Sequence, residues 1–190
     1  MKKIIAMLLA MIMLFAMTAC GAEKNTPPQD SAKPTLSGQP AESEQPSDTG
    51  EPETRIVTDA LGREVEIPAN VKTIVPLGNT PRMISYLGLA DMAVGIEECE
   101  IASSPIQAYA YPHVDKWSTL PNCGTNAMGE TAYYPEQIII ADPDVILTTD
   151  NSDVADNLQT QTGIPVVCVY QGTLFGDDYD QSLRILADVC

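Results

Sequence analysis

The chain of 190 residues has few cationic side chains and a single histidine. Ten lysines and arginines stand against 26 acidic residues, so the formal net charge is −16. This shortage of positive charge argues against a nucleic-acid ligand and against electrostatic binding to anionic lipid. A dedicated zinc or manganese site needs several converging histidines and carboxylates, and His113 alone is too few. We therefore interpret Glu97, Glu98 and Glu100 as a solvated surface.

The sequence also lacks the short motifs that carry common enzyme chemistry. It contains no G-x-S-x-G, no P-loop and no G-x-G-x-x-G, and one histidine restricts any Ser/His/Asp arrangement. No CxxC pair occurs, so a zinc ribbon and a thioredoxin-type site have no support. We predict a protein without catalytic residues, without a cofactor and without a dedicated metal site.

The N-terminus has the composition of a signal peptide, which we assign to residues 1–19. Two lysines precede an apolar stretch from Ile4 to Met17, which is short for a membrane span. The segment Met17-Thr18-Ala19-Cys20-Gly21 then resembles the lipobox of bacterial lipoproteins. This resemblance implies that Cys20 is lipidated and that the protein is anchored on the extracytoplasmic face of the cell membrane. An ordinary secreted protein and a single membrane helix are the alternatives.

Residues 20–54 predict a tether that begins at the lipidated cysteine. The segment after Cys20 is rich in Pro, Ser, Glu and Gln and has almost no large apolar side chains. Such a composition cannot bury enough surface to offset chain entropy, so we expect disorder, kept extended by proline and charge. Residues 55–190 are long enough for one domain with its own core.

The remainder of the chain predicts a β-hairpin followed by alternating strands and helices. Residues 55–67 form the hairpin, with Gly62 in its turn. We expect strands at 72–77, 92–96, 145–148 and 164–170, and helices at 82–87, 134–141, 154–162 and from 177. Thr80 is the predicted cap of the first helix, and Ser152 or Asp153 that of the third. The alternation predicts an α/β fold with a parallel sheet flanked by helices.

Four cysteines remain after Cys20. Cys168 lies in the apolar run IPVVCVY and is most simply a small core residue. Cys99 and Cys123 both fall in predicted loops, and an extracytoplasmic location permits disulfides, so a Cys99–Cys123 bridge stays open as an alternative.

Several blocks of the folded part resemble one known family. They are VTDALGREVEIPANVKTIVPLG, then LGLAD with VGI, and later YPEQIIIADPDVILTTDNSDVADNLQTQTGIPVVCV. They resemble the periplasmic-binding proteins that serve iron–siderophore, haem and cobalamin ABC importers. The resemblance covers residues 55–190 and implies the N-terminal, Rossmann-like lobe of two, with the start of the interlobe helix at its C-terminus. Because one lobe supplies only half of a cleft, we expect weak ligand binding by this chain alone.

The resemblance implies a function and its partners. The protein would be a substrate-binding lipoprotein that delivers a ferric siderophore, or a related metal chelate, to ABC permease subunits with a cytoplasmic ATPase. A haem or cobalamin receptor, and a truncated surface lipoprotein without transport activity, are the alternatives. In the family, a glutamate at the place of Glu136 docks into an arginine pocket on the permease, which implies the same role here. A carboxylate there also suits the first turn of a helix.

Ligand contacts are expected beyond the carboxyl ends of the parallel strands, as in other open sheets. Asn79, Thr80 and Asn151 follow predicted strands, and Arg82 lies close by with a charge that suits an anionic chelate. Tyr111 and Trp117 belong to an aromatic-rich loop, and flat rings suit the face of a chelate, porphyrin or corrin. Packing of these rings onto the sheet is the alternative. His113, in the same loop, we interpret as polar surface.

Overall fold

The computed structural model describes residues 53–101, 106–127 and 130–190. The predicted signal peptide, Cys20 and all but the last two residues of the predicted tether lie outside the described residues. No helix within the three described ranges is long and apolar enough to cross a membrane.

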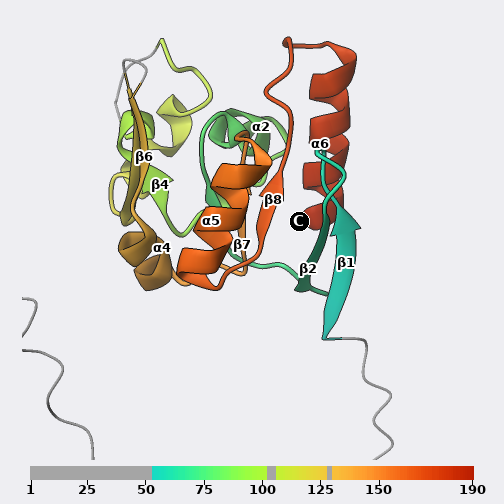
Figure 1. Ribbon diagram of the computed structural model, residues 1–190. Helices are drawn as coiled ribbons and strands as arrows, with labels where there is room; N and C mark the ends of the chain where they lie inside the picture. The colour runs from blue at the N-terminus through green and yellow to red at the C-terminus, as the bar shows by residue number, and fades with distance from the viewer. Residues whose placement is uncertain (1–52, 102–105, 128–129) are drawn as a thin grey trace, which may run out of the picture. The chain divides into compact units, whose positions relative to one another are not determined.

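The described residues alternate between strands and helices, as the sequence predicts (Figure 1). The strands are β1 (Thr54–Thr58), β2 (Glu64–Pro68), β3 (Ile74–Pro76), β4 (Ile96–Glu97), β5 (Asn122–Ala127), β6 (Glu130–Tyr133), β7 (Val145–Thr148) and β8 (Val166–Cys168). The α-helices are α2 (Thr80–Tyr86), α3 (Val114–Trp117), α4 (Pro135–Ala141), α5 (Ser152–Thr162) and α6 (Asp177–Val189). Short 3-10 turns are η1 (Ala90–Met92), η2 (Glu98–Glu100) and η3 (Tyr111–His113).

The predicted parallel sheet is formed by β3, β7 and β8, in that order. Its register places Ile74 opposite Val145 and Ile146 opposite Val166. Because both faces of this sheet are covered, its strands are apolar at nearly every position, as buried parallel strands usually are. The α/β fold class is confirmed.

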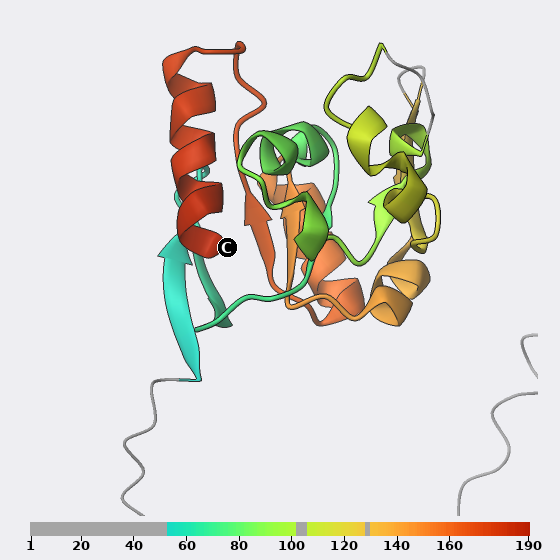
Figure 2. The ribbon, with the colours of Figure 1, turned by 180° about the vertical axis from the view of Figure 1, so that it is seen from behind.

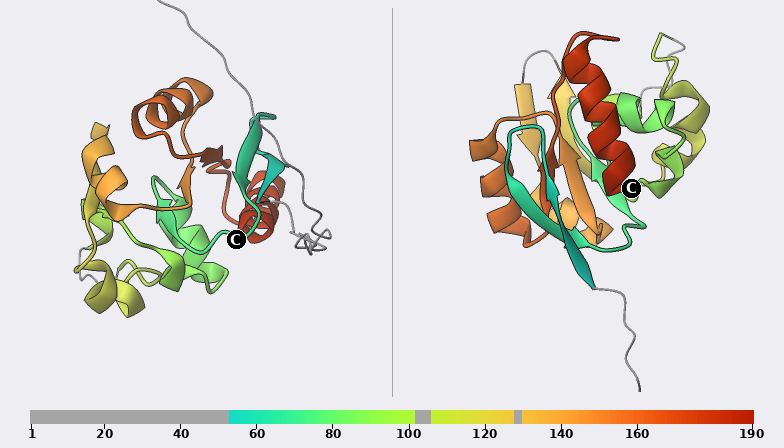
Figure 3. Two further views of the ribbon diagram at one scale, coloured as in Figure 1. Left: turned by 90° about the horizontal axis from the view of Figure 1, so that it is seen from below. Right: turned by 90° about the vertical axis from the view of Figure 1, so that its right-hand side faces the viewer.

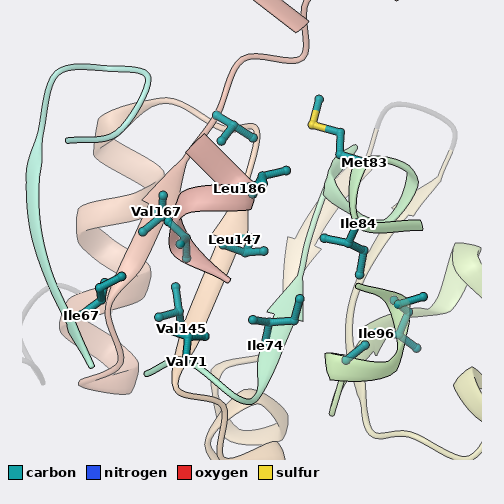
Figure 4. Packing of buried hydrophobic residues seen from close by; sticks show 14 of the residues in the cluster. Ile67, Val71, Ile74, Met83, Ile84, Ile96, Val145, Leu147, Val167 and Leu186 are labelled. Atoms are coloured by element: carbon teal, nitrogen blue, oxygen red, sulfur yellow. The ribbon is translucent and has the colours of Figure 1, made fainter. Parts of the chain in front are cut away.

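Alternate residues of the sheet contribute to two separate cores. Val145, Leu147 and Val167 pack on one side with residues of α2, α6 and β2 (Figure 4). Ile146 and Cys168 point to the other side, where α4 and α5 supply the apolar partners. One face of each covering helix is therefore committed to the sheet, and only the opposite faces remain for other contacts.

The predicted hairpin is confirmed as antiparallel β1–β2, with Gly62 at a φ of 78°. Its turn lies against the outer side of β8, where the Ala60 N–H donates to Cys168 O at 3.0 Å. The Asp59 carboxylate also accepts the N–H of Cys168 at 3.2 Å. At the other end of the hairpin, Arg55 pairs with Asp188 of α6, and Figure 3 shows the hairpin and α6 side by side.

A second sheet, β4-β5-β6, was not predicted from the sequence. It lies to one side of β3-β7-β8 (Figure 2), with β4 parallel to β5 and β5 antiparallel to β6. The strand expected at 92–96 is shorter than predicted, because Met92 ends a 3-10 turn and Ala93 makes only an isolated bridge to Ile74.

Two predicted helix caps are wrong. Thr80 is the first residue of α2, and its hydroxyl donates to Leu77 O at 2.8 Å instead of capping the helix. Asn151, one residue before the predicted caps, accepts the Val154 N–H at 3.1 Å and caps α5. A side chain can cap only from a non-helical backbone position, and the structure gives that position to Asn151.

The four cysteines among the described residues are free, so the Cys99–Cys123 alternative is not realised. Cys168 is fully buried, which confirms its prediction as a core residue.

Candidate functional site at the strand ends

Polar groups that follow β3, β4 and β7 meet at one end of the parallel sheet. The Gly78 N–H donates to Glu97 Oε2 at 2.7 Å, and the Asn79 N–H donates to Thr149 Oγ1 at 3.2 Å. Asp150 lies next to Thr149, at the end of β7. We refer to these five residues as the strand-end cluster. It occupies the place where open α/β sheets bind their ligands.

Gly78 is required at its position for two reasons. Its φ of 64° lies in the left-handed region that side chains disfavour. A Cβ atom on this residue would also come within 2.6 Å of Thr149 Oγ1. The glycine thus allows the chain after β3 to turn closely over the end of β7, which brings its N–H to Glu97.

Glu97 is a buried carboxyl group at the centre of the cluster, with no exposed surface. Its Oε1 has no hydrogen-bond partner among the described residues. The pKa of Glu97 is raised to about 7, chiefly by burial and to a smaller extent by the carboxylates of Glu100 and Asp150, while the hydrogen bond from Gly78 opposes the shift. The interpretation of Glu97 as solvated surface is therefore wrong.

Glu100 is also buried, and the same correction applies to it. Its Oε1 accepts the Tyr109 hydroxyl at 3.1 Å, while its Oε2 has no partner in the described part of the chain. Burial raises the pKa of Glu100, against the hydrogen bond from Tyr109 and the positive charge of Arg82. The Arg82 guanidinium lies 5.1 Å from the centre of the Tyr109 ring, a cation–π distance. Glu98 is exposed, as predicted for all three glutamates.

The third acidic group of the site is Asp150. Its Oδ2 accepts the Thr148 hydroxyl at 2.8 Å and also the hydroxyl of Tyr133. Burial is the largest cause that raises the pKa of Tyr133, and the hydrogen bond to Asp150 is the second. The phenol therefore stays protonated at neutral pH and donates its hydrogen bond. Tyr133 comes from β6, in the segment expected to be irregular, so sequence patterns alone did not connect it with Asp150.

The predicted ligand residues divide into two groups. Asn79 belongs to the strand-end cluster, Asn151 follows Asp150 and is exposed, and Arg82 is partly buried on α2. Thr80 is fully buried, and its hydroxyl is bonded to backbone carbonyls, so it is not available to a ligand. Its prediction as a ligand residue is corrected, because the side chain of the first helical residue here points into the core.

The prediction of Trp117 as a ligand residue is also corrected. The side chain is fully buried in the apolar core, and its indole N–H donates to Ala90 O at 3.4 Å. For this ring the alternative prediction holds, namely that it packs in the interior of the domain. His113 lies against Trp117, with ring centres 5.1 Å apart. Tyr111 is 51% exposed, and in the described residues no contact ties its ring to the cluster. Tyr109, two residues earlier, is the aromatic residue that contacts Arg82.

The cysteines near the site carry no reactive thiolate at neutral pH. Burial raises the pKa of Cys99 to about 11 and that of Cys123 to about 12, so these thiols stay protonated and unreactive at neutral pH. Within the described ranges, no three His, Cys, Asp or Glu side chains lie close enough to share one metal ion. What the site offers is buried acceptor oxygens, a guanidinium and aromatic rings.

Comparison with known proteins finds similarity among solved structures only. No family model and no curated protein matches the sequence. Among solved structures, a periplasmic solute-binding protein of Veillonella parvula matches with a TM-score of 0.56 and 22% identity, over 72% of this chain and 40% of that one.

Two further solved structures match to a similar degree. The molybdate-binding protein MolA of Haemophilus influenzae has a TM-score of 0.55 and 19% identity, over 71% and 46% of the two chains. The catecholate-siderophore binding protein VctP of Vibrio cholerae has a TM-score of 0.53 and 19% identity, over 72% and 45%. The chain therefore has the fold of part of a periplasmic solute-binding protein and spans less than half the length of these proteins.

Proposed function

We propose that this chain is the ligand-binding lobe of a lipid-anchored, extracytoplasmic substrate-binding protein of an ABC importer. The observation that carries the proposal is the strand-end cluster. In the described part of the chain, the buried Oε1 of Glu97 has no hydrogen-bond partner at the end of the sheet where open α/β folds hold ligands, and this fold is shared with solute-binding proteins. Its role is to bind a solute and deliver it, with no bond chemistry.

The cargo is a ferric siderophore or a related metal-containing anion. Arg82 supplies positive charge beside the cluster, and the rings of Tyr109 and Tyr111 supply flat apolar surface. Asn79 and Asn151 add polar contacts from the two neighbouring strand ends. Of the proteins with this fold, one is named for molybdate and another for a catecholate siderophore, and both kinds of cargo suit a cationic side chain.

The partners are the permease subunits and the ATPase of the importer. Glu136 is exposed in the first turn of α4, where nothing in the described chain engages its carboxylate in an ion pair. It is therefore available for the docking role that the sequence resemblance implies. Glu136→Ala should reduce uptake by cells without changing ligand affinity, and a loss of affinity would contradict this role.

The function is tested by calorimetry on the full-length gene product, titrated with ferric catecholate and ferric hydroxamate siderophores, haemin, cobalamin and molybdate. We expect one class to bind with a Kd below about 1 µM. Arg82→Gln should weaken that binding by about tenfold or more, because it removes a charged hydrogen-bond donor. Arg184→Gln, an exposed change on α6, is the matched control. Absence of binding across the panel would refute the proposal.

A further inference from the structure

The two buried glutamates and Asp150 differ in how well their charges are compensated. Glu100 and Asp150 each accept a hydrogen bond from at least one side-chain hydroxyl. Among the described residues, Glu97 accepts only the backbone N–H of Gly78, and no ion pair involves it. Its second oxygen, Oε1, is buried and without a partner in the same part of the chain. A negative charge on Glu97 is therefore the least compensated of the three.

The titratable groups that surround Glu97 add no positive charge. In the described ranges they are Cys99 and Glu100 of η2, Cys123 of β5, Tyr133 of β6, and Asp150 at the end of β7. Burial raises the pKa of both thiols and of the phenol, so these three groups are neutral near pH 7. Arg82 offsets the charge of Glu100 instead. The charges that act on Glu97 are therefore those of two other carboxyl groups.

A proton is the simplest compensation for this carboxyl group. Glu97 has no exposed surface, so water does not reach it to stabilise a charge, and its bond to Gly78 holds it in place. Burial is the chief reason that the pKa of Glu97 is raised to about 7, and repulsion from Glu100 and Asp150 adds to the shift. Near pH 7, about half of the free molecules therefore hold this proton.

The proposed cargo is an anion, and it enters a region that is already acidic. Arg82 is the cationic side chain described at this site, and three carboxyl groups stand against it. An anion held over the ends of β3 and β7 lies next to the Gly78 turn to which Glu97 is bonded. Like charges repel strongly where water is excluded. A proton on Glu97 removes this repulsion without moving any side chain.

We infer that an anionic cargo binds at the strand-end cluster together with one proton from the solvent, and that Glu97 holds this proton. The inference rests on the proposed function and adds a condition for binding. Because the anion and the proton favour each other, the bound anion raises the pKa of Glu97 above its value of about 7 in the free protein. Cargo affinity is therefore constant well below pH 7, where the free protein already holds the proton. It falls as the pH rises above 7, because binding must then take up a proton.

The test is calorimetry on the full-length protein with two anions that keep their charge near neutral pH, molybdate and a hexadentate ferric tris-catecholate siderophore. Titrations in buffers of different ionisation enthalpy count the protons taken up. At about one pH unit above the pKa of Glu97, wild type should take up more than about half a proton for each anion bound. Its Kd should rise about tenfold from pH ~6.5 to pH ~8.5. Glu97→Gln should abolish both effects, and Glu98→Gln, at the exposed neighbour, is the matched control that should leave them unchanged.

The outcomes separate the inference from the proposed function. If an anion binds without proton uptake, or if only neutral or cationic ligands bind, the inference is overturned and the importer role stands. Uptake that survives in Glu97→Gln, or that Glu100→Gln removes, places the proton elsewhere and also overturns it. If no ligand binds, both fail.

A second measurement uses wild type alone, so it does not depend on the folding of any variant. Infrared difference spectra above pH 7 should gain the carbonyl band of a protonated glutamic acid when the anion binds, and lack of this band overturns the inference.

Discussion

At the strand-end cluster the protein buries a carboxyl group, whereas on the outer side of α4 it exposes two large aliphatic side chains, Ile139 and Ile140. Glu97 has no exposed surface, and Ile140 is 67% exposed. In a soluble domain the usual arrangement is the reverse of both. The buried carboxyl lowers the stability of the folded lobe in its charged form, and the exposed isoleucine forgoes stability that burial would give.

The two regions differ in their chemistry. In the strand-end cluster, Glu97 Oε1 has no hydrogen-bond partner among the described residues, while the backbone N–H groups of Gly78 and Asn79 donate to the side chains of Glu97 and Thr149. The outer side of α4 instead exposes Ile139 and Ile140 beside the carboxylate of Glu136. The two features lie on separate elements, so either can be changed without the other.

The largest expected effect distinguishes the two sides of α4. Ile138→Ala should lower the free energy of unfolding by about 4 kcal/mol, because it leaves a cavity in the core under the sheet. Ile140→Ala should change it by less than about 0.5 kcal/mol, since its side chain is already in water. Urea unfolding of both variants checks this. Similar losses from the two substitutions would mean that the outer isoleucine also supports the fold.

A somewhat smaller effect is expected at the strand-end cluster. Gly78→Ala should cost about 3 kcal/mol of unfolding free energy, because it combines a left-handed backbone with a Cβ placed 2.6 Å from Thr149 Oγ1. Gly88→Ala is the matched control. The φ of Gly88 is 73°, but no atom lies within 4 Å of a Cβ at this position, so the only cost is the left-handed backbone strain of about 1 kcal/mol. Equal costs at the two glycines would contradict the close approach at Gly78.

The third effect depends on pH. The pKa of Glu97 is about 7 when folded, above the ordinary value of 4.5, so the folded state holds the proton more tightly. The stability that this group contributes is present below pH 4.5 and is lost as pH rises to 7. Glu97→Gln cannot ionise, and at pH 8 it should be more stable than wild type by about 2 kcal/mol.

The control for this experiment is Glu98→Gln, because Glu98 is the exposed neighbour. The gain from Glu97→Gln should fade as the pH falls to 4.5 and below, where the wild-type carboxyl becomes protonated in both states. A gain that is the same at pH 4.5 and pH 8 would show that the burial of charge is not its cause.

Local sequence signals predicted the hairpin and the β3-β7-β8 sheet well. The runs VILT and IPVVCVY are short, apolar and followed by capping or turn residues, so their burial on both faces was expected. The β4-β5-β6 sheet was missed because NCGTNA and ETAY contain few branched or aromatic residues. Their pairing depends on β4 and on the backbone around Gly124, which no local pattern encodes.

The candidate site was predicted only in part, because local patterns do not encode contacts between distant segments. Asn79, Arg82 and Asn151 were placed near the strand ends from strand direction alone. The burial of Glu97 was missed because its neighbours Glu98 and Glu100 made the segment look solvated, although Glu97 directly follows the buried Ile96. That position at the end of an apolar run was the available signal.

The order of strands and helices, and the end of the sheet at which the loops after β3 and β7 meet, were determined by the sequence itself. Both follow from periodicity, glycine positions and chain direction. Only the tertiary structure decided which polar residues are buried and which apolar residues are exposed. That outcome depends on what packs against each residue from distant parts of the chain. Gly78 meets Glu97 across 19 residues and Tyr133 meets Asp150 across 17, and no local pattern spans such distances.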